Sequence, residues 1–562
     1  MTDVNEEVAE LLLEFADRLE AMDVEFKPRA YRDAAESVLA AGEAELDEPE
    51  ELEDVGEAIG SKITEYLETG SVQELDELRD ELPVDIRELT AVEGVGPKTV
   101  GKLYRALDVT DLDQLEQAAR DGRIAEVEGF GERTQANLIE GIAHARKSHE
   151  RMLLDEAEEA ADTVLEAVDA LDDVVERELA GSYRRRRETV GDLDVVCVAG
   201  DREAVVEGVA EAASEVLQRG ETKSSYRFDD VRLDLHLVEA DEFGSALQYF
   251  TGSKQHNVEL RNHAISLGYK LNEYGVWDGD ERIASETEED VYAALDLSYV
   301  EPELRERRGE IQAALDGDLP ALVGYDEPRG DLHVHTDATD GRASLEEMVD
   351  AAVEYGHDYV AVTDHAEALG VAGGLSDDEL LELAAEVREI DDGRGDVSVY
   401  TGVEANLLKD GSLDVGDDVL DELDVVVASI HSGFRMTPEE ATERLVSGVR
   451  HDGVDVVGHP SGRLLNSRSG YDYDVDALLE VCRDEDVAVE VNSNPRRLDA
   501  RDIDVRRAVE RDVPVVVSTD AHSPEAYAYQ QYGVATARRG WVEADDVLNT
   551  KSAGELESWL GI

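Results

Sequence analysis

Apolar residues recur with helical spacing through the first 85 residues of the chain. Leu11, Leu12, Phe15 and Leu19 fall on one face of a predicted helix, because residues three and four apart lie on the same side. A second apolar face is formed by Tyr31, Ala34, Ala35 and Val38. Since each stretch has a single apolar face, we expect amphipathic helices that pack against one another.

From residue 151 onward, strand patterns alternate with helical ones. Val195–Val198 is a short apolar run, and apolar and polar residues alternate strictly through Val231–Leu237. The alternation predicts a half-buried strand with Arg232, Asp234 and His236 on its polar face.

The C-terminal part contains seven short apolar runs that end in polar residues, and helical patterns lie between most of them. This alternation is typical of a (β/α) barrel, in which the chemistry lies at the C-terminal ends of the strands. The runs are 331–335, 359–365, 397–404, 425–431, 454–459, 487–492 and 513–522.

One motif occurs three times in the N-terminal part. The segment 89–103 matches 124–138 at an offset of 35 residues, and 52–63 is a weaker copy. Each copy predicts a helix, a glycine turn and a second helix, which resembles the helix-hairpin-helix motif that holds the DNA backbone without reading sequence. An ordinary helical hairpin is the alternative for any single copy. The residues expected at the DNA are Gly94, Gly96, Lys98, Gly129 and Gly131.

The composition is strongly acidic. The 562 residues include 136 Asp and Glu against 53 Lys and Arg, only 10 of them lysine, for a formal net charge of −83. Disorder conflicts with the 42% hydrophobic content and the clear periodicity. We interpret the acidic excess as adaptation to molar salt, in which charge repulsion is screened within a few ångströms. Binding to DNA would then rest on geometry and on cationic spots such as Arg184–Arg187, because counterion release contributes little.

The two cysteines, Cys197 and Cys482, lie in or beside apolar segments and are expected to be buried free thiols. No stretch is apolar for long enough to span a membrane, and no basic start followed by an apolar run suggests a signal peptide. We therefore expect a cytoplasmic protein that does not contact membranes. A monomer is the default expectation, because the sequence does not indicate the oligomeric state.

The stretch 181–194 reads Gly-Ser-Tyr-Arg-Arg-Arg-Arg-Glu-Thr-Val-Gly-Asp-Leu-Asp. Asp192 and Asp194 are expected on the same face of a predicted strand, and Asp234 follows on a strand of its own. If the two strands are neighbours, three carboxylates converge and suit two Mg²⁺ (or Mn²⁺) ions, which activate an attacking hydroxyl and stabilise a leaving pyrophosphate. Asp-x-Asp alone arises easily in so acidic a chain, but the whole ordered set indicates nucleotidyl transfer.

Six of the 13 histidines stand at the ends of the C-terminal apolar runs, together with three acidic residues. Nine imidazole and carboxylate ligands can hold two or three Zn²⁺ or Mn²⁺ ions. The predicted ligands are His333, His335, Asp340, His365, Glu404, His431, His459, Asp520 and His522. His357 and His451 do not end strands and are interpreted as structural.

These motifs carry two family resemblances. Residues 1–317 resemble family X DNA polymerases, the group that includes DNA polymerase beta, through the stretch at 181–194, Arg-Leu-Asp-Leu, Tyr-Phe-Thr-Gly-Ser and Leu-Gly-Tyr-Lys-Leu-Asn-Glu-Tyr. The C-terminal part resembles the PHP (polymerase and histidinol phosphatase) domain, whose nine ligands match without a gap. This second resemblance implies a seven-stranded distorted barrel that hydrolyses phosphoesters at a trinuclear centre.

The polymerase resemblance also implies roles for single residues. Asp192 and Asp194 would bind both metals, and Asp234 would assist the primer 3′-hydroxyl. Arg186 departs from the family, which usually has glycine there, and Val258 stands where some members have a cation. The implied nucleotide and nascent-pair contacts are Ser182, Arg185 and Gly191 at the triphosphate, Tyr249, Phe250 and Gly252 at the sugar, and Asn257 and Arg261 in the minor groove.

Lys62 aligns with the Schiff-base lysine of the family's deoxyribose-phosphate lyase domain, with Tyr31 and Lys27 at supporting positions. A nucleophilic lysine needs desolvation or cationic neighbours, whereas nearby glutamates would raise the pKa of Lys62. We therefore interpret Lys62 as a contact to a DNA phosphate. In the C-terminal part, Arg463 and Lys409 are candidate phosphate clamps.

The predicted fold is multidomain, α+β and α/β, with helical helix-hairpin-helix domains, a nucleotidyltransferase palm and a C-terminal distorted (β/α)₇ PHP barrel. The expected domains are a helical lyase-like domain at 1–85, a helix-hairpin-helix domain at 86–150, the palm at 151–240, a nascent-base-pair-binding domain at 241–317, a linker at 318–329 and the PHP domain at 330–562.

The sequence therefore predicts a DNA-directed DNA polymerase that fills short gaps with dNTPs, joined to a metal-dependent 3′→5′ exonuclease with abasic sites and 3′-phosphates as further candidate substrates. The main alternative is a PHP nuclease or phosphatase whose polymerase half only binds DNA. A non-enzymatic gap binder would not need two ligand sets. A small-molecule phosphatase would leave the helix-hairpin-helix repeats unexplained.

Overall fold

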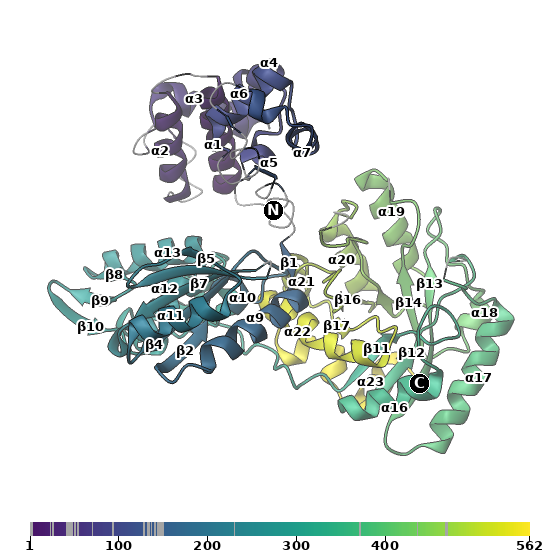
Figure 1. The fold of residues 1–562 in the computed structure, drawn as a ribbon. Coiled ribbons are helices and arrows are strands. Elements are labelled where there is room, and N and C mark those ends of the chain that lie inside the picture. The colour runs from purple at the N-terminus through teal and green to yellow at the C-terminus, as the bar shows by residue number, and fades with distance from the viewer. Residues whose placement is uncertain are drawn as a thin grey trace. The chain divides into compact units, whose positions relative to one another are not determined.

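The structure, a computed structural model, forms two compact units, residues 1–151 and 152–562 (Figure 1). It describes residues 4–562 except 23, 25–26, 41–48, 50–51, 53–54, 70, 91, 93–94, 128–129, 132–134, 136–137, 140–141, 143–150, 230, 370–371, 435 and 467–469.

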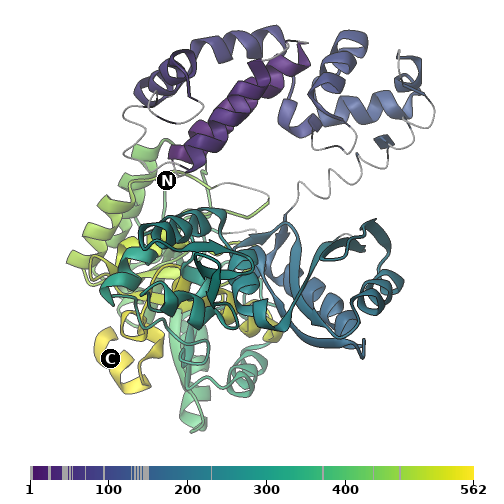
Figure 2. The same cartoon turned by 90° about the vertical axis from the view of Figure 1, so that its left-hand side faces the viewer.

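Over its described residues, the N-terminal unit consists of helices and turns (Figures 1 and 2). Both predicted apolar faces are buried in one cluster, in which the rings of Phe15 and Tyr31 stack with centroids 5.0 Å apart. The predicted amphipathic helices are therefore confirmed. The helices are α1 (Val4–Ala21), α2 (Lys27–Ala40), α3 (Glu57–Thr69), α4 (Gln73–Glu81), α5 (Ile86–Thr90), α6 (Pro97–Leu107) and α7 (Leu112–Arg120).

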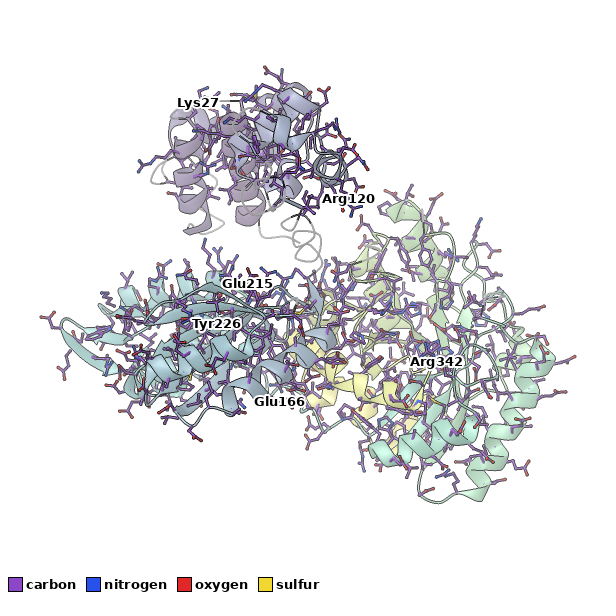
Figure 3. All side chains as sticks on the ribbon, in the orientation of Figure 1. Lys27, Arg120, Glu166, Glu215, Tyr226 and Arg342 are labelled. Carbon is purple, nitrogen blue, oxygen red and sulfur yellow. The ribbon has the colours of Figure 1, made fainter. Side chains whose placement is uncertain are left out.

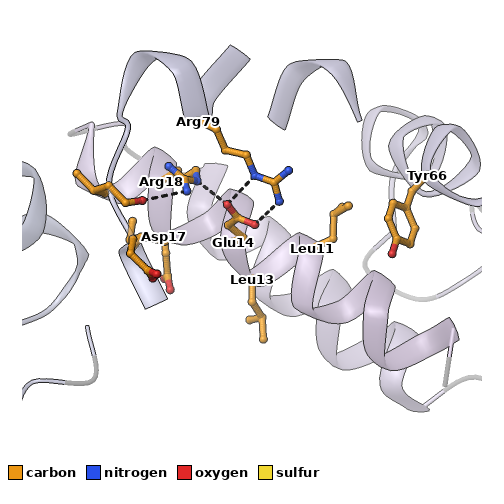
Figure 4. Close-up of a pocket in the computed structure, with 10 residues that line it drawn as sticks. Leu11, Leu13, Glu14, Asp17, Arg18, Tyr66 and Arg79 are labelled. Atoms are coloured by element: carbon orange, nitrogen blue, oxygen red, sulfur yellow. Dashed lines mark hydrogen bonds and ion pairs between the residues drawn. The ribbon is translucent and has the colours of Figure 1, made fainter. Parts of the chain in front are cut away.

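Ionic contacts connect α1 to residues far along the chain. Glu14 accepts hydrogen bonds from Arg18 and Arg79, and Arg18 also donates to the carbonyl oxygens of Leu82 and Val84. The network lines a hollow of about 740 Å³ (Figure 4). Burial acts to raise the pKa of Glu14, but the two arginines outweigh it and lower the pKa. We interpret the network as structural, because its charges are paired.

The three copies of the glycine motif share one local geometry. In each copy, the carbonyl oxygen of a glycine accepts the first i→i+4 hydrogen bond of the second helix. The bonds run from Gly60 to Gly56, from Val100 to Gly96 and from Gln135 to Gly131. Gly94 and Gly129, two of the predicted DNA contacts, lie outside the described residues.

The second unit begins with a five-stranded sheet in the order β2–β4–β7–β6–β5, in which only β4 and β7 are parallel. Helices α9 and α11 cover one face, and α12 (Phe243–Thr251) covers the other. The elements are β1 (Met152–Leu153), α9 (Leu154–Asp169), β2 (Val174–Leu179), α10 (Gly181–Arg184), β3 (Thr189–Val190), β4 (Leu193–Ala199), α11 (Arg202–Ala212), β5 (Glu215–Gln218), β6 (Lys223–Phe228) and β7 (Val231–Val238).

The prediction of a half-buried strand is wrong for β7. Asp234 and His236 are only 5% and 3% exposed. The cause is α12, because the ring of its Phe250 stacks on His236 with centroids 3.7 Å apart. Asp234 and His236 are therefore buried, whereas Arg232 on the same face is exposed.

A smaller segment of helices and a three-stranded antiparallel sheet follows. Arg305 in its core pairs with Glu288 at 2.6 Å, and Arg184 of α10 pairs with the same carboxylate at 2.7 Å. Burial acts to raise the pKa of Glu288, but the two arginines hold the pKa at about 2. The elements are α12 (Phe243–Thr251), α13 (Lys254–Ser266), β8 (Lys270–Asn272), β9 (Gly275–Asp278), β10 (Glu281–Ala284), α14 (Glu288–Ala294) and α15 (Glu310–Asp316).

The C-terminal part is a parallel sheet of seven strands in sequence order, β11 to β17. The N–H of His335 donates to the carbonyl oxygen of Ala521 at 2.9 Å, which joins the first strand to the last and nearly closes a barrel. The predicted distorted (β/α)₇ barrel is thus confirmed (Figure 1).

The strands of the barrel are β11 (Gly330–Val334), β12 (Tyr359–Val362), β13 (Ser398–Asn406), β14 (Val425–Ser429), β15 (Val456–Val457), β16 (Ala488–Asn492) and β17 (Val515–Ser518). Its helices are α16 (Leu345–Tyr355), α17 (Asp377–Gly393), α18 (Asp417–Leu420), α19 (Pro438–Val449), α20 (Val475–Asp484), α21 (Asp502–Val509), α22 (Gln530–Arg539) and α23 (Ala553–Leu560).

The sheet of the second unit and the barrel share apolar packing. Leu498 and Tyr532 of the barrel belong to the same buried cluster as the core of β4 and β7. The hydroxyl of Tyr532 also donates to Glu158 of α9 at 2.7 Å. Within 318–329, predicted as a linker, Val323 is buried in the core of the barrel.

Cys197 and Cys482 are free and fully buried, as predicted. Glu166 and Glu215 lie on the surface, whereas Tyr226 lies inside the palm sheet (Figure 3). Across the described part of the chain, none of the helices combines the length and the apolar character needed to cross a membrane.

Candidate active sites

The first candidate site lies where β4 and β7 run side by side. The parallel register pairs Asp194 directly with Asp234, and Asp192 lies just before β4 rather than on it. Asp234 contacts Arg232 at 2.9 Å and Lys223 at 2.7 Å. Burial acts to raise the pKa of Asp234, but these cations hold it at about 2.

The carboxylates of Asp194 and Asp234, which are paired in the sheet, contact other side chains rather than each other. Asp194 faces Nε2 of His236 at 3.0 Å, and Asp234 faces the two cations. Among the described residues, some groups of three or more possible ligands have atoms within 4.8 Å of one another. All of these groups lie in the barrel. The palm nevertheless fits hard divalent cations, because it presents carboxylate oxygens from two adjacent strands beside an aspartate turn.

The loop before these aspartates packs directly on one of them. Gly181 has a φ of +63°, and a Cβ there would stand 2.4 Å from Oδ2 of Asp194, so this position requires glycine. Ser182 follows in α10, and Gly191 lies in the turn before Asp192. Arg185 pairs with Glu306 and donates to the carbonyl oxygen of Thr251.

The residues predicted beside the sugar lie at the end of α12. The rings of Tyr249 and Phe250 meet edge to face, and Gly252 caps the helix with a φ of +68°. Through its stacked ring, His236 connects Phe250 to Asp194. On α13, Asn257 donates to the carbonyl oxygen of Tyr249 at 2.7 Å. Arg261 is exposed one turn further along α13.

Arg186 has a left-handed backbone with a φ of +52°, a conformation that favours glycine. Its guanidinium lies over the ring of Tyr183 at 5.3 Å and 3.7 Å from Glu158. The arginine therefore keeps the glycine-like backbone path and adds a cation to this loop.

In the N-terminal unit, Nζ of Lys62 pairs with Glu74 at 2.9 Å. Burial acts to lower the pKa of Lys62, but Glu74 and Tyr31 outweigh it and raise the pKa. The expected direction is therefore found, although the main partner is Glu74 rather than the glutamates nearest in sequence. Gly96, Lys98 and Gly131 are all exposed.

The second candidate site lies at the C-terminal ends of the barrel strands and contains all nine predicted ligands. The ligands form three groups, and within each group the ligand atoms lie within 4.8 Å of one another. His335 and His365 each belong to two of these groups. Glu404 lies within β13 and faces Nδ1 of His365 at 2.8 Å, Nε2 of His459 at 3.0 Å and Nε2 of His431 at 3.1 Å. The groups are His335, Asp340, His365 and His522; His333, His335 and Asp520; and His365, Glu404 and His431.

The donor set of the barrel fits transition metals. His333, His335 and His459 each have a buried ring nitrogen without a hydrogen-bond partner. Burial lowers the pKa of His335 to about 3, so its ring is neutral and can act as a ligand. Buried polar atoms normally have partners, and a metal ion would supply partners to these nitrogens.

Sequence reasoning missed the residues that orient the ligands. Glu490 is fully buried and accepts from Nδ1 of His333 at 2.6 Å and from the backbone N–H of His459 at 2.7 Å. The side chain of Asn492 donates to Oδ2 of Asp520 at 3.1 Å. The available signal was a glutamate and an asparagine in the one apolar run that supplied no predicted ligand, since a buried charge needs a partner.

Replacing Glu490 with glutamine is expected to weaken metal binding in the barrel by roughly ten- to a hundredfold, because the carboxylate that orients His333 is lost. The measurement is isothermal titration of the metal-free protein with Zn²⁺ or Mn²⁺. Asp455→Asn is the matched control, because Asp455 bonds the backbone N–H of Val426 in the same barrel. Wild-type affinity in Glu490→Gln would refute the orienting role.

Two predicted phosphate clamps differ in their surroundings. Arg463 is 6% exposed, pairs with Glu188 at 2.8 Å and donates to the carbonyl oxygens of Arg497 and Leu498. Because its ion pair joins the barrel to Glu188 of the palm, we interpret Arg463 as a brace between the two rather than as a phosphate clamp. Lys409 is exposed.

The two histidines interpreted as structural lie outside the three ligand groups. His357 is buried beside the rings of Tyr355 and Tyr527. His451 lies 3.4 Å from Asp417.

Comparison with protein families gives five matches along the chain. A helix-hairpin-helix domain matches residues 3–72, and a SAM-like helix-hairpin-helix tandem matches 86–143. The DNA polymerase beta palm matches 151–231, and the DNA polymerase beta thumb matches 246–306. The PHP domain matches 331–494.

Three curated relatives match this chain over different shares of its length. DNA polymerase lambda of Rattus norvegicus is 26% identical over 45% of this chain and 47% of its own length. A probable phosphatase of Thermoanaerobacter sp. (strain X514) is 24% identical over 41% of this chain and 93% of its own length. The DNA polymerase/3′-5′ exonuclease PolX of Bacillus subtilis (strain 168) is 34% identical over 96% of both chains. This last similarity spans nearly the whole length of both chains and agrees with the family matches. The protein therefore belongs to the family X DNA polymerases that carry a C-terminal PHP domain.

Proposed function

We propose that this protein is a DNA-directed DNA polymerase that fills short gaps in DNA repair and that its barrel is a metal-dependent 3′→5′ exonuclease. The observation that carries the proposal is the presence of two separate sets of ligand side chains, one on β4 and β7 and one at the barrel strand ends. The similarity to a Bacillus subtilis protein named for both activities supports it. Gapped or primed DNA and dNTPs are the substrates.

In the palm, Asp192, Asp194 and Asp234 hold two Mg²⁺ (or Mn²⁺) ions, which supply activation of the primer 3′-hydroxyl and charge neutralisation when bound. Arg232 and Lys223 keep Asp234 ionised, so it can accept a hydrogen bond from the primer hydroxyl. His236 holds Asp194 in place from inside the sheet.

The incoming nucleotide lies between α10 and α12. Ser182, Arg185 and Gly191 hold the triphosphate, for which a guanidinium fork is well suited. Tyr249, Phe250 and Gly252 form the wall beside the sugar and disfavour a 2′-hydroxyl. The minor-groove contacts are Asn257 and Arg261, and the backbone contacts are Gly94, Gly96, Lys98, Gly129, Gly131 and Lys62.

In the barrel, the nine ligands hold two or three Zn²⁺ or Mn²⁺ ions, which supply a nucleophile and polarise the phosphodiester when bound. The carboxylate of Glu404 contacts three imidazoles, and Glu490 orients the ring of His333 through a hydrogen bond. Mismatched or blocked 3′ ends are the main substrates, with abasic sites and 3′-phosphates as further ones.

A second candidate function is a PHP nuclease or phosphatase whose polymerase half only delivers DNA. Two observations favour it: the chain is similar to a probable phosphatase over 93% of that protein's length, and the palm aspartates do not form a group as close as the barrel ligands do. In that case only degradation would be observed.

The testing experiment follows a labelled primer on a gapped duplex with Mg²⁺ or Mn²⁺ over a series of KCl concentrations. Extension by dNTPs together with degradation in their absence supports the proposal. Degradation without any extension would favour the second candidate function.

We also propose that the acidic surface is an adaptation to high salt in a cytoplasmic monomer. The melting temperature is expected to rise by roughly 10 °C or more between 0.1 M and 2 M KCl, because the Debye length falls from about 10 Å to below 3 Å. Thermal unfolding followed by circular dichroism measures the shift, with sucrose of equal osmolarity as the control. A melting temperature that does not rise with KCl would refute the adaptation.

A further inference from the structure

The palm loop that carries Arg185 and Arg187 is joined to the barrel through the carboxylate of Glu306. Its Oε1 lies 2.9 Å from Nε of Arg185 and 3.2 Å from Nη1 of Arg539, and its Oε2 lies 3.7 Å from Arg187. The side chains of Arg185 and Glu306 are only 13% and 12% exposed, so water screens these contacts weakly.

Arg539, the last residue of α22, makes two contacts that converge on Arg185. Its Nη1 donates to the backbone carbonyl oxygen of Arg185 at 2.9 Å and also reaches Glu306, the counter-ion of that arginine. From the other side, Asp502 at the start of α21 pairs with Arg539 at 2.7 Å and with Arg308 at 3.0 Å. One buried guanidinium of the barrel therefore holds both the backbone and the counter-ion of Arg185.

We propose that Arg539 is a positioning residue for the incoming nucleotide, through which the barrel places Arg185 to hold the triphosphate. The inference rests on the proposed polymerase function. It assigns the barrel a part in nucleotide addition that is separate from its own metal site.

The argument follows from the charges around Glu306. Burial acts to raise the pKa of Glu306, but Arg539, Arg185 and Arg187 hold it at about 2, so the carboxylate is ionised at neutral pH. Without Arg539, the carboxylate would face only Arg185 and Arg187 and would hold Arg185 more strongly. The triphosphate would then have to compete with Glu306 for Arg185, on a loop that had lost a hydrogen bond to its backbone.

This arrangement predicts an effect on nucleotide binding rather than on chemistry. In Arg539→Ala, the KM for dNTP on a one-nucleotide gap should rise about tenfold, as expected for the loss of a hydrogen bond to a charged group. The value of kcat should stay within about twofold, because the contacts of Arg539 run to Arg185, Glu306 and Asp502 rather than to Asp194 or Asp234. The KM of Arg539→Lys should fall between those of the wild type and Arg539→Ala, because lysine keeps the positive charge but not the forked guanidinium.

Arg538→Ala is the matched control. Arg538 is the neighbouring residue on α22 and also bridges out of the barrel, pairing with Glu303 at 2.7 Å and donating to the carbonyl oxygen of Val323. It makes no contact with Arg185, so its removal should leave the KM for dNTP within about twofold. An equal rise in KM for both alanine variants would indicate general loosening of the interface and would overturn the inference.

Equilibrium binding of dNTP and Mg²⁺ on a dideoxy-terminated primer separates this inference from the proposed function. A dissociation constant about tenfold higher in Arg539→Ala than in the wild type supports the inference, even if the wild type adds no nucleotide and the proposed function fails. Equal dissociation constants overturn the inference whatever the extension rates. Arg539→Lys, which keeps the buried charge, provides the same comparison if Arg539→Ala does not fold.

Discussion

Alanine at both Asp192 and Asp194 is expected to abolish primer extension, while degradation continues at the wild-type rate. The carboxylates supply the oxygen ligands for two ions, whose stabilisation of the transition state is worth several kcal/mol, so extension should fall by at least about a thousandfold. The fold should persist, because Asp192 and Asp194 are only half-buried. The measurement is extension of a labelled primer across a one-nucleotide gap with Mg²⁺.

The matched control removes two carboxylates from the same sheet with the same spacing. Glu176 and Glu178 are exposed on β2, which pairs with β4, and their replacement by alanine should leave extension unchanged. Extension by the aspartate variant at more than a tenth of the wild-type rate would place the polymerase chemistry elsewhere. An equal loss in both variants would point to a general effect of charge.

The barrel could be predicted from sequence because two signals coincide in it. Its strands are buried on both faces, so they stand out as apolar runs, and six of the seven runs lead into or contain metal-ligating side chains. Glu404 was also predicted as a ligand. It lies within β13 rather than at its end, because that strand extends past it to Asn406. The amphipathic helices of the N-terminal unit were predictable for the simpler reason that each has one buried face.

The contacts between palm and barrel could not be predicted. Leu498 completes the palm core from a loop that shows no periodicity, and Arg463 reaches Glu188 across 275 positions of sequence. In the sequence, an isolated arginine that binds a phosphate cannot be distinguished from one that binds a carboxylate of its own chain. The same limit hid Arg539, whose importance depends entirely on where Glu306 and Asp502 are placed by the fold.

The buried polar face of β7 shows a different limit. The strict alternation of Val231–Leu237 correctly predicted a strand but said nothing about whether another element covers its polar side. Phe250 of helix α12 covers His236, and Asp234 is buried beside Lys223 and Arg232, while Arg232 itself remains exposed. A pattern of period two reports which residues share a face, whereas tertiary packing decides whether that face meets water.

Alanine at both His333 and His335 is expected to remove the degrading activity by at least about a thousandfold and to leave primer extension unchanged. His335 belongs to two of the three ligand groups and His333 to one of them, so the double substitution disrupts two groups at once. It also leaves Glu490 buried without the imidazole of His333, at a cost of about 3–5 kcal/mol for a broken buried pair. The bound metal content of the purified protein should fall together with the activity.

The control for this loss is His357→Ala, which removes a buried imidazole of the same barrel that lies outside the ligand groups. It should retain both metal content and degradation. Because the loss of buried pairs lowers stability, His335→Gln serves as a milder variant that keeps much of the side-chain volume. If His335→Gln retains wild-type degradation and metal content, the barrel is not the exonuclease. If extension falls together with degradation, the two activities depend on one site, because independent sites would not respond to the same imidazole.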